Sequence, residues 1–221
     1  MPVLEKLLSF IAPHECLVCE AEGELVCREC HDIAIQKVPS RCYRCHKLTN
    51  GFRVCLPCRA SSKLTAVWVA ADYAGTAKEL IHKLKYQRAQ TAARVIAAYL
   101  YETLPTPPAD FVIVPLPTAT SRRRQRGYDQ AELIAKEYAH LTGAQYKTLL
   151  HRFGQSRQVG THRKERLEQL ETAFWADKSA QKTKVLLIDD VTTTGATLEA
   201  AAKVLREAGS SRVAALCFAQ A

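Results

Sequence analysis

The sequence predicts an α/β protein with a largely parallel sheet and helices on both faces, preceded by a small cysteine-rich module. Three observations support this fold class. Segments of strand length alternate with helical patterns through residues 64–221. These strand segments are apolar throughout, which is typical of parallel strands covered on both faces. Eight of the nine cysteines precede residue 59, where they form four Cys-x-x-Cys pairs.

The first elements of the larger part begin just after residue 64. Thr65–Asp72 has the composition of a strand, and Thr76–Tyr86 and Ala92–Leu104 carry large apolar residues at helical spacing. Prolines between residues 105 and 108 end the second helix, because proline lacks a backbone donor and fixes φ. Phe111–Pro115 is then expected to form a short buried strand.

The remaining elements continue the alternation. Tyr128–His140 is expected to be a helix, and Lys184–Asp189 a strand with a continuous apolar centre. Ala196–Ala208 is the next expected helix, with Gly209 at the position of a C-cap glycine. Arg212–Phe218 forms the last expected strand.

The cysteine pairs predict two structural zinc sites. They are Cys16 and Cys19, Cys27 and Cys30, Cys42 and Cys45, and Cys55 and Cys58. Each pair aims two thiolates at one tetrahedral centre, and an all-sulfur set leaves no position open for catalysis. Disulfides are disfavoured because no signal peptide precedes the pairs. A redox motif would normally occur once, and iron–sulfur ligation fits regularly paired knuckles less well.

The pairing of the knuckles is open between two arrangements. Consecutive knuckles enclose loops of seven and nine residues, which favours one site from the first four cysteines and one from the last four. An interleaved, RING-like arrangement would exchange them. The cysteines stop before Lys63, so we expect residues 1–63 to form a double zinc-ribbon module with a short N-terminal helix. Residues 64–221 would then form the α/β domain.

Positive charge is concentrated in two clusters within a chain of net charge +9. The first consists of Arg122, Arg123, Arg124 and Arg126, and the second of Arg152, Arg157, Arg163, Lys164 and Arg166. Such clusters indicate an anionic ligand, either phosphate groups or a nucleic acid backbone, although a basic surface without a partner is the plainer alternative. The apolar stretch Val3–Ala12 is too short for a membrane span, so a cytoplasmic protein is expected.

Residues 185–198 place an apolar strand, two acids, a Thr/Gly turn and a helix in succession. Backbone N–H groups and hydroxyls at a helix N-terminus can hold a phosphate, and Gly195 lets the backbone approach it closely. Asp189 and Asp190 can accept hydrogen bonds from the vicinal hydroxyls of a sugar. A sugar phosphate site is therefore predicted. An ordinary turn with capping threonines is less favoured, because open α/β sheets bind ligands at this end of their strands.

This segment resembles the phosphoribosyl pyrophosphate (PRPP) signature of type I phosphoribosyltransferases. The resemblance implies a type I phosphoribosyltransferase fold and a catalytic role for Asp189 and Asp190, which would hold the ribose hydroxyls. It assigns the 5′-phosphate to the loop Val191, Thr192, Thr193, Thr194, Gly195, Ala196 and Thr197. The 6-oxopurine transferases carry an acid at the place of Thr193. Because threonine cannot act as a carboxylate base, hypoxanthine or guanine salvage is not expected.

A second resemblance covers nearly the whole chain. Leu80–Tyr86, Val114–Pro117, Arg124–Gln130 and the cysteine knuckles together resemble the ComF family of competence and DNA-utilisation proteins. That resemblance implies PRPP, accompanied by Mg²⁺, as the ligand. It places the pyrophosphate against Pro115, Leu116, Arg122, Arg123, Arg124 and Arg126. Gln155–Arg166 would form a segment able to close over substrates and exclude water.

Two classes of function follow from these features. One is an enzyme that transfers phosphoribosyl from PRPP to a nucleobase. The other is a competence factor that binds single-stranded DNA, or an adaptor for DNA-uptake proteins, in which the PRPP site is not catalytic. The basic clusters, the zinc module and aromatic neighbours such as Tyr86 and Tyr128 support the second class. The favoured interpretation is nevertheless a PRPP-binding, phosphoribosyltransferase-like protein, as the two resemblances imply.

Overall fold

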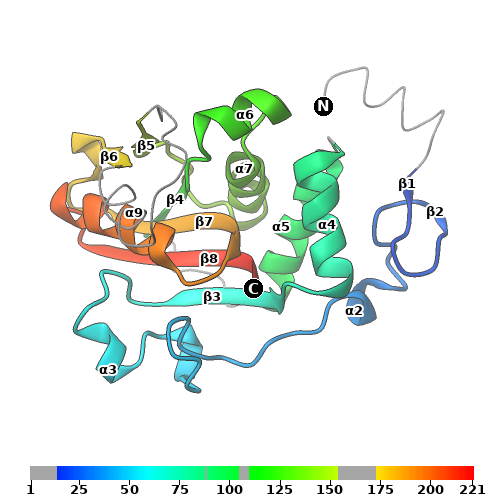
Figure 1. Cartoon of the computed structure of the whole chain (residues 1–221), viewed down its shortest axis with the longest axis horizontal. Coiled ribbons are helices and arrows are strands. Elements are labelled where there is room, and N and C mark those ends of the chain that lie inside the picture. Colours follow the sequence, from blue (N-terminus) through cyan, green and yellow to red (C-terminus); the bar gives the residue numbers. More distant parts are fainter. Residues whose placement is uncertain (1–13, 88, 105–109, 154–172) are drawn as a thin grey trace, which may run out of the picture.

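A parallel sheet forms the centre of the molecule. The computed structural model describes residues 14–87, 89–104, 110–153 and 173–221. Its four-stranded sheet has the order β3-β8-β7-β4 (Figure 1). The strands are Val67–Asp72 (β3), Phe111–Pro115 (β4), Lys184–Thr192 (β7) and Arg212–Gln220 (β8), all paired in parallel. β4 is buried along its whole length, as its uniformly apolar sequence predicts. The α/β class is confirmed.

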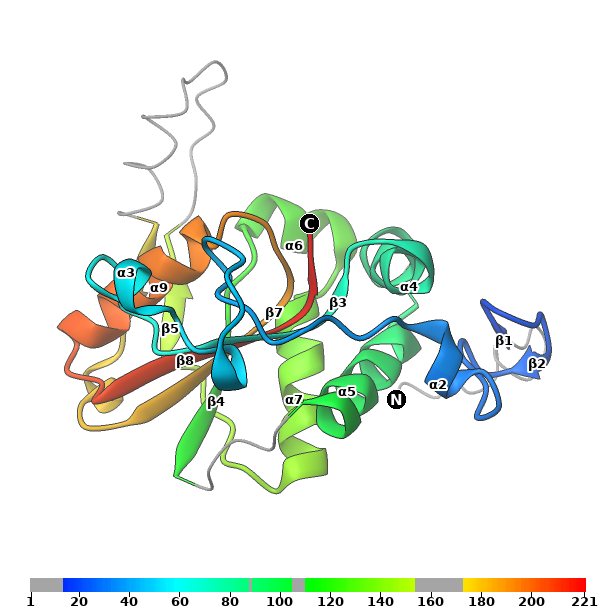
Figure 2. The same ribbon diagram turned by 90° about the horizontal axis from the view of Figure 1, so that it is seen from below.

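Helices cover both faces of this sheet (Figure 2). They are α4 (Gly75–Tyr86), α5 (Thr91–Thr103), α6 (Thr120–Arg126), α7 (Gln130–Thr142) and α9 (Ala196–Glu207). α5 and α7 pack together on one face, whereas α9 packs against the other. Their buried side chains recur at three- and four-residue spacing, as in Leu80, Ile81 and Leu84 of α4.

The chain reverses its direction of travel across the sheet between β4 and β7. After β4 and α7 the chain runs outward, and Ile113 pairs in parallel with Tyr146 beyond β4. After β7, by contrast, α9 leads back to β8 on the other side. Right-handed crossovers in opposite directions put the two helices on opposite faces and open a crevice at the carboxyl ends of the two strands. The fold thus provides a ligand position between β4 and β7.

Several boundaries differ from those expected. α7 begins at Gln130, because the Asp129 side chain caps it by accepting from the N–H groups of Ala131 and Glu132. β7 runs on to Thr192, beyond Asp189. Gly209 follows α9 with a φ of +93°, which suits the expected C-cap glycine. Four elements of the larger part had not been expected: α6, the antiparallel pair of β5 (Leu150–Arg152) and β6 (Phe174–Ala176), and the 3₁₀ turn Lys178–Ala180.

The cysteine-rich segment lies along one edge of the sheet. Its elements are β1 (His14–Glu15), β2 (Glu22–Gly23), α2 (His31–Ala34), a 3₁₀ turn (Asn50–Phe52) and α3 (Leu56–Arg59). Isolated bridges join Lys37 to Ala71 and Arg53 to Ala66, so the segment follows β3. β1 and β2 lie at one end of the molecule, and α3 lies towards the other (Figure 2). The expected N-terminal helix and the segment Gln155–Arg166 fall outside the described residues.

Candidate functional site

The acidic pair stands at the carboxyl end of β7. The backbone N–H of Asp190 donates to Oδ1 of Asp189 at 2.8 Å, and Nζ of Lys85 lies 2.7 Å from Oδ2 of Asp190. Burial raises the pKa of Asp189 well above its usual value, and the charge of Asp190 raises it further. Lys85 opposes both effects, since its positive charge favours the ionised carboxylate. The pair is therefore an acceptor site, with Asp190 buried and Asp189 half-buried, that one cation partly neutralises.

A cavity of about 450 Å³ opens beside this pair, between β4 and β7. Seven of the residues predicted for the site line it: Leu116, Arg122, Arg126, Asp189, Asp190, Val191 and Thr197. Pro115 and Arg123 instead line an adjoining cavity of about 310 Å³, and Arg124 lines neither. The arginine run splits in this way because it forms helix α6, whose successive residues point in different directions.

The predicted phosphate loop is shorter than expected. Val191 and Thr192 belong to β7, and Thr192 is buried. The turn itself consists of Thr193, Thr194 and Gly195, and α9 begins at Ala196. Thr193 and Thr194 are exposed, and Gly195 has a φ of +73°, a left-handed conformation that favours glycine. Of the predicted loop, Val191 and Thr197 line the larger cavity, whereas Thr193, Thr194 and Gly195 do not.

Sequence reasoning assigned no role to several residues of the crevice. Lys85, Thr118, Ser121 and Gln130 also line the larger cavity, together with Arg152 of the second predicted basic cluster. Asp129 holds the loop after β4, because its carboxylate accepts from the backbone N–H of Thr118 at 2.8 Å and from the Thr118 hydroxyl at 3.0 Å. Burial raises the pKa of Asp129. Lys85 and Asp129 both occur in the motifs that carry the family resemblance, and this was the available signal.

Arg152 adds a second positive wall to the crevice. Burial and the charge of Arg122 both lower the pKa of Arg152, so the two guanidinium groups repel each other electrostatically. Because an isolated guanidinium stays protonated at any ordinary pH, the effect is repulsion between two cations rather than loss of charge. An anion placed between them would relieve that repulsion.

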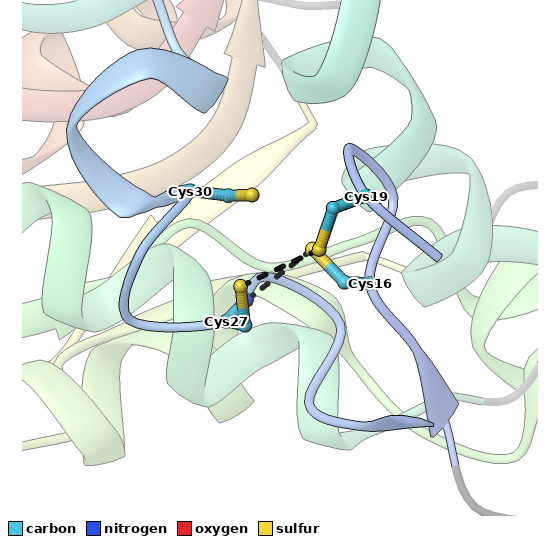
Figure 3. Close-up of side chains that lie close together, drawn as sticks. All are labelled: Cys16, Cys19, Cys27 and Cys30. Carbon is cyan, nitrogen blue, oxygen red and sulfur yellow. Dashed lines mark hydrogen bonds between the residues drawn. The ribbon is translucent and has the colours of Figure 1, made fainter. Parts of the chain in front are cut away.

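The cysteine sulfurs gather into two clusters, which Figure 3 shows for the first of them. Cys16, Cys19, Cys27 and Cys30 form the first cluster, and Cys42, Cys45, Cys55 and Cys58 form the second, with all sulfurs of a cluster within 4.8 Å of one another. This is the consecutive pairing, not the interleaved one. Sulfur separations of 3.7 Å (Cys19 to Cys27) and 3.4 Å (Cys45 to Cys55) are near the roughly 3.8 Å of a tetrahedral zinc–sulfur site. All nine cysteines are free thiols.

The local backbone prepares these thiols to bind a cation. Burial opposes ionisation of Cys16 and Cys42, yet N–H groups of the knuckles outweigh it and lower the pKa of each to about 6. Hydrogen bonding with Cys19 raises the pKa of Cys30 to about 12, and Cys55 does the same for Cys58. Four thiolates this close need a bound cation to ionise together, so both clusters fit a metal ion.

Comparisons with known proteins cover most of the chain. It is 27% identical to the DNA utilization protein YhgH of Salmonella typhi over 93% of this chain and 96% of that protein. It is 27% identical to the competence protein ComFC of Bacillus subtilis over 89% of this chain and 90% of that protein. The resemblance to the ComF family is confirmed. Competence protein F of Haemophilus influenzae is 30% identical, over 61% of this chain and 63% of its own length. No family model matches the chain.

Solved structures similar to this ComF-like chain include two enzymes of phosphoribosyl chemistry. The glutamine PRPP amidotransferase of B. subtilis is 22% identical with a TM-score of 0.39, over 57% of this chain and 26% of that one. The purine phosphoribosyltransferase of Pyrococcus horikoshii is 15% identical with a TM-score of 0.34, over 62% and 75% of the two chains. At such scores the α/β fold class rests on the strand order and connectivity above. Among the described residues of the ComF-like chain, no helix has the length and apolarity needed to cross a bilayer.

Proposed function

We propose that this ComF-like chain binds PRPP with Mg²⁺ in the crevice between β4 and β7, as a phosphoribosyltransferase-like protein. The observation that carries the proposal is the convergence of two opposite chemistries on one cavity. Asp189 and Asp190 offer acceptors at one side, whereas Arg122, Arg126 and Arg152 offer positive charge on the walls. PRPP carries both vicinal hydroxyls and several phosphates, so one molecule of it meets both requirements.

The residues around the crevice would bind different parts of PRPP. Asp189 and Asp190 accept hydrogen bonds from the ribose hydroxyls, and the turn before α9 holds the 5′-phosphate with backbone N–H groups. Mg²⁺, when bound with PRPP, neutralises part of its charge. In transfer, a ring nitrogen of the base bonds to the anomeric carbon, the bond to pyrophosphate breaks, and pyrophosphate leaves with the electron pair while the base loses a proton. Arg122 and Arg126 stabilise the charge that develops on this leaving group.

Calorimetric titration of the full-length protein with PRPP and Mg²⁺ tests the first step. We expect binding by the wild type and at least about tenfold weaker binding by Asp190→Asn, since a charge-assisted hydrogen bond is worth about 1.5–3 kcal/mol. Asp110→Asn is the matched control, because Asp110 is exposed and pairs with Lys184 away from the crevice. A wild-type protein that binds no PRPP would refute the proposal. A screen of nucleobases for pyrophosphate release then tests transfer itself.

The cysteine clusters are proposed to hold two structural zinc ions. Four thiolates leave no position open for substrate, and the separations of the sulfurs suit tetrahedral zinc. Free thiols in this number require a reducing compartment, so the proposal places the protein in the cytoplasm. Elemental analysis of purified protein should find two zinc ions per chain.

A second candidate function is binding of single-stranded DNA, either directly or as an adaptor in DNA uptake. Its specific support is Tyr86, the last residue of α4. The Tyr86 side chain is 64% exposed, and the Arg126 guanidinium lies 5.3 Å from its ring centre. A base can stack on such a ring while the cation approaches the phosphate backbone. The names of the similar proteins, a competence protein and a DNA utilization protein, agree with this candidate.

Fluorescence anisotropy with a labelled oligonucleotide tests this candidate at several salt concentrations. We expect binding that weakens steeply between about 50 and 200 mM salt, because counterions are released on binding. Tyr86→Ala should weaken binding, whereas Tyr101→Ala, at another exposed tyrosine on α5, should not. Absence of binding at about 50 mM salt would exclude the candidate.

A further inference from the structure

Gly195 in the turn before α9 lies against a tyrosine from the cysteine-rich segment. A Cβ atom at Gly195 would lie 2.2 Å from Cε2 and 2.6 Å from Cδ2 of Tyr43, so the ring occupies the space that any other residue would need. Glycine is thus required twice, by the left-handed φ and by the ring. The sequence alone accounted for this glycine by the approach of a phosphate, whereas the structure shows it covered on one side by protein.

Tyr43 is fixed in this position at both ends. It lies between Cys42 and Cys45, two sulfurs of the second cluster, and is 1% exposed. Its hydroxyl donates to a carboxylate oxygen of Glu199, and its backbone carbonyl accepts from Nε2 of Gln220 at 3.1 Å. The knuckle that would hold the metal ion is therefore the same short segment that places the ring.

Glu199 joins the other side of the second cluster to the same turn. Besides the Tyr43 hydroxyl, its carboxylate accepts from the Ser62 hydroxyl and from the backbone N–H of Lys63 at 2.9 Å. Its own backbone N–H donates to the carbonyl of Gly195 at 2.9 Å. A residue between the first two cysteines of the second cluster and two residues after its last cysteine thus meet on one carboxylate in the first turn of α9.

The first cluster has no such relation to the turn within the described residues. It packs on α5, where the His31 ring stacks on Tyr99 at 4.1 Å and the Tyr99 hydroxyl donates to the His31 carbonyl. His14 contacts Thr91 of the same helix at 3.0 Å. In Figure 2, β1 and β2 of this part lie at the far end of the molecule from α9. The two clusters therefore support different parts of the α/β fold.

We propose that Tyr43 is a positioning residue for the turn of Thr193, Thr194 and Gly195. In this proposal, a metal ion at the second cluster determines how rigidly the turn is held. As regards affinity for a phosphate ligand, the inference rests on the proposed function above. The metal holds Cys42 and Cys45, these hold the Tyr43 ring, and the ring fixes the backbone whose N–H groups face the ligand. The first cluster stabilises the protein without this effect.

Hydrogen exchange tests the structural half of the inference without any ligand. Full-length, zinc-loaded wild type is compared with Cys45→Ser in the second cluster and Cys19→Ser in the first, both at exposed cysteines. Exchange in residues 193–199 should be about tenfold faster in Cys45→Ser and change less than about twofold in Cys19→Ser. Equal acceleration in the two variants would overturn the inference. If Cys45→Ser does not fold, Tyr43→Leu takes its place, with Tyr99→Leu as the matched control.

A double-mutant cycle tests the contact itself. Gly195→Ala should accelerate exchange in residues 193–199 by a larger factor in the wild-type background than in Tyr43→Leu, because the new methyl group meets the ring only in the former. Tyr43→Phe keeps the ring and loses the hydrogen bond to Glu199, so it should lie between wild type and Tyr43→Leu. Additive effects of Gly195→Ala and Tyr43→Leu would refute the contact as the source of coupling.

PRPP affinity provides the second readout and separates the two proposals. Cys45→Ser and Tyr43→Leu should bind PRPP about tenfold more weakly than wild type, and Cys19→Ser with unchanged affinity. If wild type binds no PRPP, the proposed function fails, and the exchange measurements still decide the inference. If wild type binds PRPP and the second-cluster variants bind it equally well, the inference fails and the proposed function stands.

Discussion

Nζ of Lys85 on α4 lies 2.7 Å from Oδ2 of Asp190 on β7, across the mouth of the crevice. Lys85 and Asp190 have side chains only 20% and 10% exposed. The ion pair therefore joins a helix from one crossover to the strand that carries the acidic pair. Lys85 also places one positive charge beside the carboxylates of Asp189 and Asp190. Among the described residues, no other cation forms an ion pair with either carboxylate.

Replacing Lys85 by methionine should destabilise the protein by about 2 kcal/mol, because it keeps the aliphatic stem but leaves Asp190 buried without its partner. Urea denaturation at pH 7 measures this as a lower free energy of unfolding. Lys78→Met is the matched control on the exposed face of α4 and should change stability by less than about 0.5 kcal/mol. Equal effects of the two substitutions would contradict a role for the ion pair.

Stability should fall with rising pH through the titration of Asp189. Burial raises the pKa of this carboxyl in the folded state, so folding favours its protonated form. The stabilising contribution is complete below the unfolded pKa of about 3.9 and is lost as pH rises through the folded value. Asp189→Asn should remove this slope and raise the melting temperature at pH 8 relative to wild type. Calorimetric melting of both proteins from pH 4 to 8 measures the melting temperature at each pH. A pH dependence of the variant parallel to that of wild type would contradict the role of Asp189.

Loss of the Asp129 carboxylate should release the loop after β4. Asp129→Ala removes the cap of α7 and both bonds to Thr118, so we expect a loss of about 2 kcal/mol in unfolding free energy. Asp129→Asn should cost less, since an amide oxygen can still accept from the helix N–H groups. Urea denaturation of the two variants distinguishes these values. Similar losses would mean that the charge, not the acceptor geometry, matters.

Metal content should fall by one ion for each cluster that is broken. Wild type is expected to bind two zinc ions per chain, and Cys19→Ser and Cys45→Ser one each, by elemental analysis after dialysis. Removing both proposed ions with a chelator should lower the melting temperature, because a segment with few large apolar residues would rely on metal ions for its stability. Unchanged metal content in either variant would contradict the assignment of that cluster.

The sequence predicted the elements with strong apolar periodicity and missed those without it. The strands β4 and β7 and the helices α4, α5, α7 and α9 follow from continuous or periodic apolar residues. α6 has no apolar face, because every residue of Thr120–Arg126 is polar or charged, and it forms after the loop that follows β4. β5 and β6 have only three residues each, too few for a two-residue period to be recognised.

The candidate site was predictable as a set of motifs but not as an arrangement. Asp189 and the turn before α9 are adjacent in sequence, so their common location followed from one segment. The contact of Tyr43 with Glu199 joins residues 156 positions apart, and no local pattern records it. The split of the arginine run between two cavities likewise depends on helix α6, which the sequence did not reveal.

The bridges from Lys37 to Ala71 and from Arg53 to Ala66 place the cysteine-rich segment along the free edge of β3. β3 is the outermost strand on its side of the sheet and is largely buried, so its free backbone groups would otherwise offer a template for pairing with another chain. The segment blocks that edge with short, irregular contacts that do not themselves extend the sheet. If the clusters hold zinc as proposed, chains without the metal should expose this edge of β3 and aggregate more readily than zinc-loaded chains.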